Sequence, residues 1–205
     1  MLEAAALVAL GYLLGSMPWG VWLPRLLVGV DVREVGSGNT GATNVWRALG
    51  FKLGLAVALL DILKGVVPAL LARWFVGDVV AVLAGLAAMV GHWRPLFLRF
   101  AQGGKMVATS AGVGLAVASL ATLAAAGVWV LVFLATRYAS VASIAAALVL
   151  PVFAVVFDAS PAVLAFTAAA GVAVILLHRA NISRLRAGTE NRFRLRKRAV
   201  ARVNA

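Results

Sequence analysis

The chain has 205 residues, of which 63% are hydrophobic and 13% charged, with 19 Lys and Arg against 7 Asp and Glu and no cysteine. Ordinary soluble domains are about 25% charged, so this composition argues against a soluble globule, and a mean hydropathy of +1.01 argues against nucleic acid as the reason for the basic charge. Without cysteine there is no disulfide scaffold, no thiolate zinc site and no acyl-cysteine intermediate. We predict a small all-α protein that crosses a membrane several times.

Apolar runs define the predicted spans. About 20 apolar residues cross a bilayer as one helix, and such runs lie at 3–28, 53–76, 78–92 and 161–178, the last two being short. The first run lacks the positive start of a signal peptide and is longer than a cleavable core, so we predict a span there. Residues 106–157 form another long apolar region, with turns predicted near Ser119 and Arg137.

The distribution of Lys and Arg predicts the orientation, because these residues gather at the cytoplasmic ends of spans. They are concentrated in 31–52, in 92–105 and from 179 onward, which we place in the cytoplasm, whereas the connections at Asp78 and Asp158 are placed outside with the N-terminus. Residues 106–157 must then cross an odd number of times. We predict seven transmembrane helices, with five as the alternative.

Two regions follow from this topology. We expect an integral membrane domain over 1–181 and a basic cytoplasmic tail over 182–205.

The first polar cluster lies between the first two spans. It runs Gly36-Ser37-Gly38-Asn39-Thr40-Gly41-Ala42-Thr43-Asn44 and is followed by Arg47. Its glycines allow positive φ angles that turn successive N–H groups toward one point, which is typical of an anion-binding nest. The alternative is a flexible turn that ends in a helix cap at Thr40 or Thr43.

The second polar cluster contains Gly91-His92-Trp93-Arg94 and then Phe100-Ala101-Gln102-Gly103-Gly104-Lys105. Paired glycines and a lysine at the start of a helix favour phosphate binding. It is not a Walker A loop, because Met106 follows Lys105 and the required spacing fails. For Arg94 and Arg99 we prefer the alternative interpretation as membrane anchors.

The third polar cluster follows the last span. His178 and Asn181 are three residues apart and can share a helix face, and Gly188-Thr189-Glu190 follows them. With two histidines in the chain, neither followed by Asp five residues later, the His-x4-Asp dyad of soluble-type acyltransferases is absent, and no Gly-x-Ser-x-Gly elbow occurs. In the second span, Asp61 and Lys64 are predicted to form a structural ion pair.

In this order, the three clusters resemble the motifs of the bacterial membrane acyl-phosphate:glycerol-3-phosphate acyltransferases, the PlsY family. The resemblance covers nearly the whole chain and includes the stretch Asp61-Ile62-Leu63-Lys64-Gly65. It departs from the family's usual second motif, Phe-x-Gly-Gly-Lys-Gly. Here both Ala101 and Gln102 separate Phe100 from Gly103, and Met106 takes the place of the last glycine.

The resemblance implies transfer of a fatty acyl group from acyl phosphate to the 1-hydroxyl of glycerol 3-phosphate, giving lysophosphatidic acid and phosphate, the first step of phospholipid synthesis. It implies a multi-pass protein of the bacterial inner membrane, with its active site on the cytoplasmic side and in contact with membrane lipid. No cofactor, metal or nucleic acid is expected. The alternative is a transporter or channel for small anions.

The resemblance also assigns residues. The expected catalytic residues are His178, Asn181 and Lys105, with His178 as the side-chain base and a substrate phosphate oxygen as its competitor. Glu190 is expected to be structural. The expected phosphate-binding residues are Ser37, Gly38, Asn39, Gly41, Asn44, Arg47, Gly103, Gly104 and Lys105.

Overall fold

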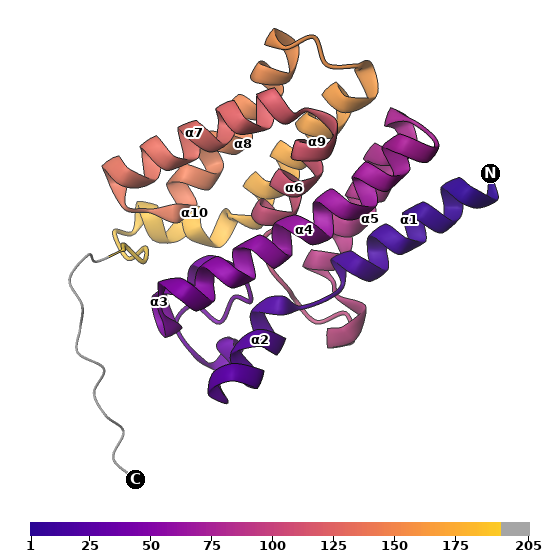
Figure 1. Ribbon diagram of the computed structural model, residues 1–205. Helices are drawn as coiled ribbons and strands as arrows, with labels where there is room; N and C mark the ends of the chain where they lie inside the picture. The colour runs from indigo at the N-terminus through magenta and orange to yellow at the C-terminus, as the bar shows by residue number, and fades with distance from the viewer. Residues whose placement is uncertain (194–205) are drawn as a thin grey trace.

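The computed structural model describes residues 1–193, and within that range it contains helices, turns and loops without any strand (Figure 1). The long apolar helices are α1 (Leu2–Gly15), α4 (Phe51–Phe75), α5 (Asp78–Trp93), α7 (Ser119–Thr136), α8 (Ala139–Val156) and α9 (Pro161–Leu177). The shorter helices are α2 (Trp19–Val28), η1 (Val32–Glu34), α3 (Ala42–Leu49), η2 (Leu96–Leu98), α6 (Val107–Val117) and α10 (Arg179–Arg186). The all-α prediction is confirmed.

The first predicted span, 3–28, is wrong as a single straight helix. It is broken into α1 and α2, whose axes differ by 41°. The break lies at Met17-Pro18, where proline has no N–H to donate and disfavours helical backbone in the residue before it. The carbonyl of Met17 accepts a hydrogen bond from Lys64 Nζ at 2.9 Å. A buried lysine of α4 thus provides a donor for a carbonyl at the break between the two helices.

By length and composition, four helices of the described chain can each cross a bilayer, or six if the bent pairs α1–α2 and α9–α10 each count as one span. The predicted turns are confirmed, since α6 meets α7 at Ala118 and α7 meets α8 at Arg137. Helix α6 has 11 residues, about 16 Å of helix against a hydrocarbon core of about 30 Å. The count of seven therefore stays a prediction.

Small residues let the helices pack closely. Helices α1, α4 and α5 lie side by side (Figure 1), and a Cβ added at Gly11 or Gly15 would overlap the α5 backbone at Ala84 or Ala88. Gly65 of α4 meets α6 in the same way at Thr109. Close approach through small residues is the usual means of helix association in membranes, where lipid is as apolar as the side chains.

The end of the bundle that holds the α4–α5 and α8–α9 turns is fastened by polar contacts. Arg73 lies 3.1 Å from Asp78, and the Ser160 hydroxyl donates to Asp78 at 2.8 Å. Arg73 also donates to the carbonyl of Ala116 at 2.8 Å, which brings the end of α6 to the same place. The expectation that the Asp78 and Asp158 turns share one end of the molecule agrees with these contacts.

The predicted boundary between 181 and 182 falls inside α10 (Arg179–Arg186). Beyond that helix, Glu190 and Phe193 are buried against the bundle. Residues 182–193 therefore pack with the helical domain, and the rest of the predicted tail, 194–205, lies outside the described residues.

Candidate active site

The three polar clusters converge at the opposite end of the bundle from Asp78. Asn39 of the first cluster donates to the carbonyl of Gly103 in the second at 3.4 Å. Lys105 Nζ donates to Asn181 Oδ1 of the third cluster. Arg47 donates to the carbonyl of Asn191 at 3.4 Å and so joins the first cluster to the third. Residues more than a hundred positions apart thus form one site.

Asn44 organises the first loop from within. Its side chain is 1% exposed, and Oδ1 accepts from the N–H of Ser37 at 2.8 Å. Nδ2 donates to the carbonyls of Val32, Val35 and Asn39 at 3.0 to 3.2 Å. Its amide hydrogens are therefore occupied, and in this structure Asn44 shapes the loop that carries Ser37 instead of offering a donor to phosphate.

The paired glycines of the second loop close that loop on itself. The N–H of Gly103 donates to the carbonyl of Trp93 at 2.8 Å, and that of Gly104 to the carbonyl of His92 at 3.1 Å. A Cβ at Gly104 would overlap the His92 ring. These N–H groups, expected to be phosphate donors, are used within the loop, and neither glycine lines the cavity.

Met106 preserves the turn at the position where the family motif has glycine. Its φ of +67° lies in the left-handed region, which glycine adopts without steric cost and which costs other residues about 1–2 kcal/mol. The Met106 side chain is 5% exposed and packs in the main hydrophobic core. Burial of that side chain offsets the backbone cost, so Lys105 keeps its place before α6.

Glu190 anchors a hydrogen-bond network that ends at Lys105. Its Oε1 accepts from Asn181 at 2.6 Å and from Ser140 at 2.8 Å, and its Oε2 accepts from Arg184 at 2.7 Å. Burial opposes ionisation of Glu190, but these three donors outweigh it and lower its pKa. The carboxylate orients Asn181, and Asn181 in turn accepts the hydrogen bond from Lys105.

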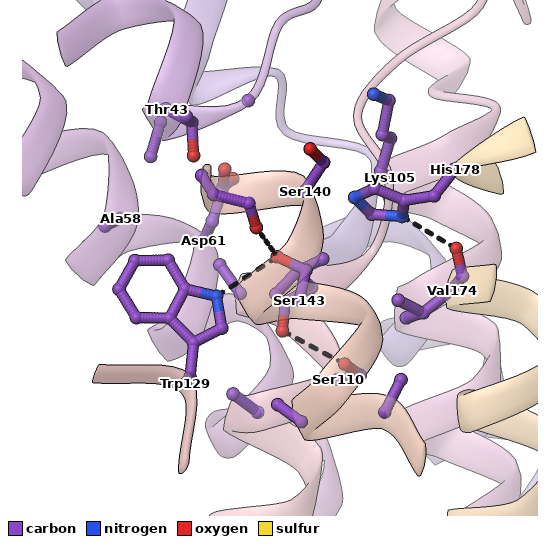
Figure 2. A pocket seen from close by; sticks show the side chains of 18 of the residues that line it. Thr43, Ala58, Asp61, Lys105, Ser110, Trp129, Ser140, Ser143, Val174 and His178 are labelled. Atoms are coloured by element: carbon purple, nitrogen blue, oxygen red, sulfur yellow. Dashed lines mark hydrogen bonds between the residues drawn. The ribbon is translucent and has the colours of Figure 1, made fainter. Parts of the chain in front are cut away.

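His178 begins the bend between α9 and α10 and is 4% exposed. Its Nδ1 lies 2.7 Å from the carbonyl of Val174 (Figure 2). A carbonyl oxygen can only accept, so Nδ1 carries the proton of the neutral ring and Nε2 keeps a lone pair. Figure 2 shows Lys105 beside this ring.

The electrostatics of the site favour an anion. Arg47, Lys105 and Arg184 surround one carboxylate, Glu190, which is already paired with Arg184. Burial, together with the nearby Arg184 and Arg47 charges, lowers the pKa of Lys105 to about 8. Burial also lowers the pKa of Arg47. Cations that are partly removed from water and not neutralised gain most from a phosphate ligand.

A cavity of about 440 Å³ opens from these groups into the bundle. The polar end of the cavity is lined by Glu190 and by the expected site residues Ser37, Asn39, Gly41, Asn44, Arg47, Lys105, His178 and Asn181. We call this end the mouth. The expected site residues Gly38, Gly103 and Gly104 do not line the cavity. The remaining walls are mostly small apolar residues of α4, α6, α7, α8 and α9. We call this apolar part the cleft.

Sequence reasoning missed the contributions of α7 and α8 to the cavity. Ser140, Ser143 and Trp129 line it, and Trp129 Nε1 donates to Ser143 Oγ at 3.1 Å (Figure 2). Ser143 Oγ in turn donates to the carbonyl of Ala139 at 2.8 Å. The available signal was two serines three residues apart in an otherwise apolar run, which places them on one helix face.

The predicted ion pair between Asp61 and Lys64 is confirmed at 2.7 Å, and both side chains are buried. His92, which also lines the cavity, lies 3.6 Å from the same Asp61 oxygen. Because the His92 ring and carbonyl contact Gly104, this cluster supports the second loop from inside the bundle.

Comparison with known proteins gives concordant matches. A family model described as "Glycerol-3-phosphate acyltransferase" matches residues 5–188. A glycerol-3-phosphate acyltransferase of Geobacter sulfurreducens is 46% identical over 195 residues, which is 95% of this chain and 100% of that protein. One from Anaeromyxobacter sp. is 48% identical over 196 residues, 92% of this chain and 96% of that protein.

Two solved structures share the fold. The glycerol 3-phosphate form of PlsY, an integral membrane glycerol 3-phosphate acyltransferase, matches with a TM-score of 0.90 and 45% identity, covering 94% of this chain and 96% of that chain. Its lysophosphatidic acid form matches with a TM-score of 0.88 and 44% identity, at the same coverage.

Proposed function

The chain belongs to the family of integral membrane glycerol-3-phosphate acyltransferases, and from this premise we propose that its acyl donor is acyl phosphate. The enzyme acylates glycerol 3-phosphate, and the predicted alternative, an anion transporter or channel, is not favoured by these relatives. With acyl phosphate as donor, the products are lysophosphatidic acid and inorganic phosphate.

The observation that carries the proposal is the joining of a cationic mouth to an apolar cleft in one cavity. The cleft runs along α8 from Ser140 to Leu150, about 15 Å at 1.5 Å per residue. An acyl phosphate is a long apolar chain that ends in an anionic head, so its two parts match the two parts of the cavity. A second phosphate, that of glycerol 3-phosphate, can share the surplus positive charge at the mouth.

We assign roles from these contacts. Lys105, Arg47 and Ser37 bind the phosphates, and Asn181 and Glu190 keep Lys105 in place through their hydrogen bonds. The other expected phosphate-binding residues hold the loops in shape: Gly38, Asn39, Gly41, Asn44, Gly103 and Gly104. The Glu190 carboxylate acts on substrate only through Asn181 and Lys105.

We propose direct transfer without an acyl-enzyme intermediate. The 1-hydroxyl oxygen of glycerol 3-phosphate forms a bond to the acyl carbonyl carbon, the bond from that carbon to the phosphate oxygen breaks, and inorganic phosphate leaves. His178 Nε2, whose lone pair is free in the described structure, takes the hydroxyl proton. Positioning and charge stabilisation supply most of the rate, because the mixed anhydride is already activated.

We also propose that seven spans place the mouth in the cytoplasm of the bacterial inner membrane. The mouth end carries most Lys and Arg, whereas Arg73 at the opposite end is paired with Asp78, as the charge rule for cytoplasmic ends requires. Helix α6 counts as a short span because α4, α5, α7 and α9 surround it, so it does not have to match the thickness of lipid.

The direct test is to incubate the purified chain with acyl phosphate and glycerol 3-phosphate and to measure lysophosphatidic acid and phosphate. His178→Ala should lower the maximal rate by roughly 10²- to 10⁴-fold. A modest loss would reassign the proton to a substrate phosphate oxygen. Flux of labelled anion through proteoliposomes without phosphate release would support the transporter instead.

Orientation can be tested cleanly because the chain has no cysteine. Lys52→Cys and Ser119→Cys each place a thiol at an exposed position, the first near the mouth and the second at the α6–α7 junction. In intact cells, an impermeant thiol reagent should label only Ser119→Cys. Labelling of both on the same side would contradict the proposed topology.

A further inference from the structure

The segment from Glu190 to Phe193 begins at the mouth of the cavity, which Glu190 lines. It follows the turn after α10, and the N–H of Phe193 donates to the carbonyl of Arg137 at 2.9 Å. Phe193 is 8% exposed despite its position in a polar, basic stretch. It lies beyond residues 5–188, which the family model matches, so the family resemblance gives it no role.

The Phe193 ring fills the space between α3 and α7. Its centroid lies 4.8 Å from that of Trp46 on α3 and 5.1 Å from that of Phe133 on α7. Trp46 and Phe133 are themselves 5.9 Å apart. We call these three residues the aromatic clasp. Tilted and edge-to-face packing of this kind contributes about 0.5–1.5 kcal/mol per pair beyond burial, so the clasp joins the first cluster to the α7–α8 hairpin.

The same ring supports a site residue. The guanidinium carbon of Arg47 lies 5.5 Å from the Phe193 centroid, and Arg47 also donates to the carbonyl of Asn191. Within residues 1–193, no carboxylate lies within ion-pair distance of Arg47. A ring face and a carbonyl orient a guanidinium without cancelling its charge, so Arg47 stays available to a phosphate.

We propose that Phe193 is a positioning residue that acts through Arg47: its ring holds the guanidinium at the mouth in the orientation that binds a substrate phosphate. The proposal rests on the proposed function of this cavity. It extends the functional part of the chain past the third motif, and it explains why an aromatic residue is buried among arginines at this point.

The test uses steady-state kinetics of the full-length chain with each substrate varied in turn. Phe193→Leu keeps an apolar side chain but removes the ring face. It should raise the KM for a phosphate substrate about 3- to 30-fold, as expected for a partly desolvated cation–π contact, with a smaller change in kcat. Phe193→Tyr, which restores a ring, should recover the KM. Phe157→Leu at the opposite end is the matched control and should leave both constants unchanged.

A double-substitution cycle separates positioning from general support of the fold. On an Arg47→Gln background, which has no cation to lie over the ring, the effect of Phe193→Leu should largely disappear. Equal losses on both backgrounds, or no loss on either, would overturn the proposal. If Phe193→Leu does not fold, Phe193→Met takes its place in the same cycle. If the unsubstituted chain makes no lysophosphatidic acid, the proposed function itself fails, whereas an active chain insensitive to Phe193 refutes only the clasp.

Discussion

Lys105 should give the acylation a pH dependence that few other groups of the site can supply. Its pKa is lowered to about 8 by burial and by the neighbouring Arg184 and Arg47 charges. About ten ammonium forms exist for each neutral one at pH 7, and the ratio is reversed at pH 9. If the ammonium binds phosphate, kcat/KM should fall about tenfold between pH 7 and 9, with a midpoint near 8 in the free enzyme.

The other ionisable partners are nearly constant over this range. Phosphate esters have a second pKa of about 6 and are mostly doubly ionised from pH 7 upward, and the arginines at the mouth stay charged. Lys105→Arg therefore provides the control: its guanidinium keeps its charge through pH 9, so the alkaline decline should vanish even if the variant is slower. Initial rates of lysophosphatidic acid formation, with non-enzymatic hydrolysis of acyl phosphate subtracted, give the profile.

The same pKa has a consequence for stability with a definite sign. A lysine that titrates near 8 when folded and at 10.5 when unfolded makes the unfolded chain bind more protons between these values. The free energy of unfolding should then rise with pH from about 8 to 10.5.

An alkaline decline in activity that persists in Lys105→Arg, or a flat profile in the unsubstituted enzyme, would refute the assignment of Lys105 as the titrating phosphate ligand.

Three further substitutions test the loop, the network and the cleft. Gly104→Ala adds a Cβ that overlaps the His92 ring, so kcat/KM should fall at least about tenfold because the second loop is displaced. Gly127→Ala is the control: a Cβ added there has no neighbouring atom within 4 Å, so this variant should match the unsubstituted enzyme. Glu190→Gln removes a buried carboxylate that accepts three hydrogen bonds. It should destabilise the fold by about 3 kcal/mol, seen as a lower melting temperature in detergent, and an unchanged melting temperature would contradict the network. Ala125→Leu narrows the cleft and should shift the preference toward shorter acyl phosphates, by about 0.8 kcal/mol for each excluded methylene. An unchanged ratio of kcat/KM for long and short donors would show that the acyl chain of the donor lies elsewhere.

Local sequence patterns were sufficient where the chemistry depends on neighbours along one segment. The spacing of His178 and Asn181 placed them together, and the spacing of Asp61 and Lys64 predicted their ion pair, now found at 2.7 Å. These predictions need only the geometry of a helix, in which residues three apart share a face.

Contacts between segments could not be predicted in the same way. The N–H groups of Gly103 and Gly104 looked free to bind an anion, but the loop returns to Trp93 and His92 and uses them. The cleft wall formed by Trp129 and Ser143 depends on how the α7–α8 hairpin packs against α6 and α9, which hydropathy does not specify. Pro18 is plain in the sequence, but the hydrogen bond from Lys64 to the Met17 carbonyl at the bend joins two separate helices and could not be predicted from it.

The pairing of charges explains why the mouth remains available to two phosphates. Several other charged side chains are paired with an opposite charge, and the hydrogen bond from Arg33 lowers the pKa of Asp31 to about 2. These pairs are Arg25 and Arg33 with Asp31, Lys64 with Asp61 and Arg73 with Asp78. Within residues 1–193, Arg47 and Lys105 have no carboxylate at ion-pair distance and are oriented by neutral groups, a ring and an amide. Both cations are therefore held in position, but their charges stay unpaired until substrate binds. Binding of a substrate phosphate then compensates the free-energy cost of burying the two cations.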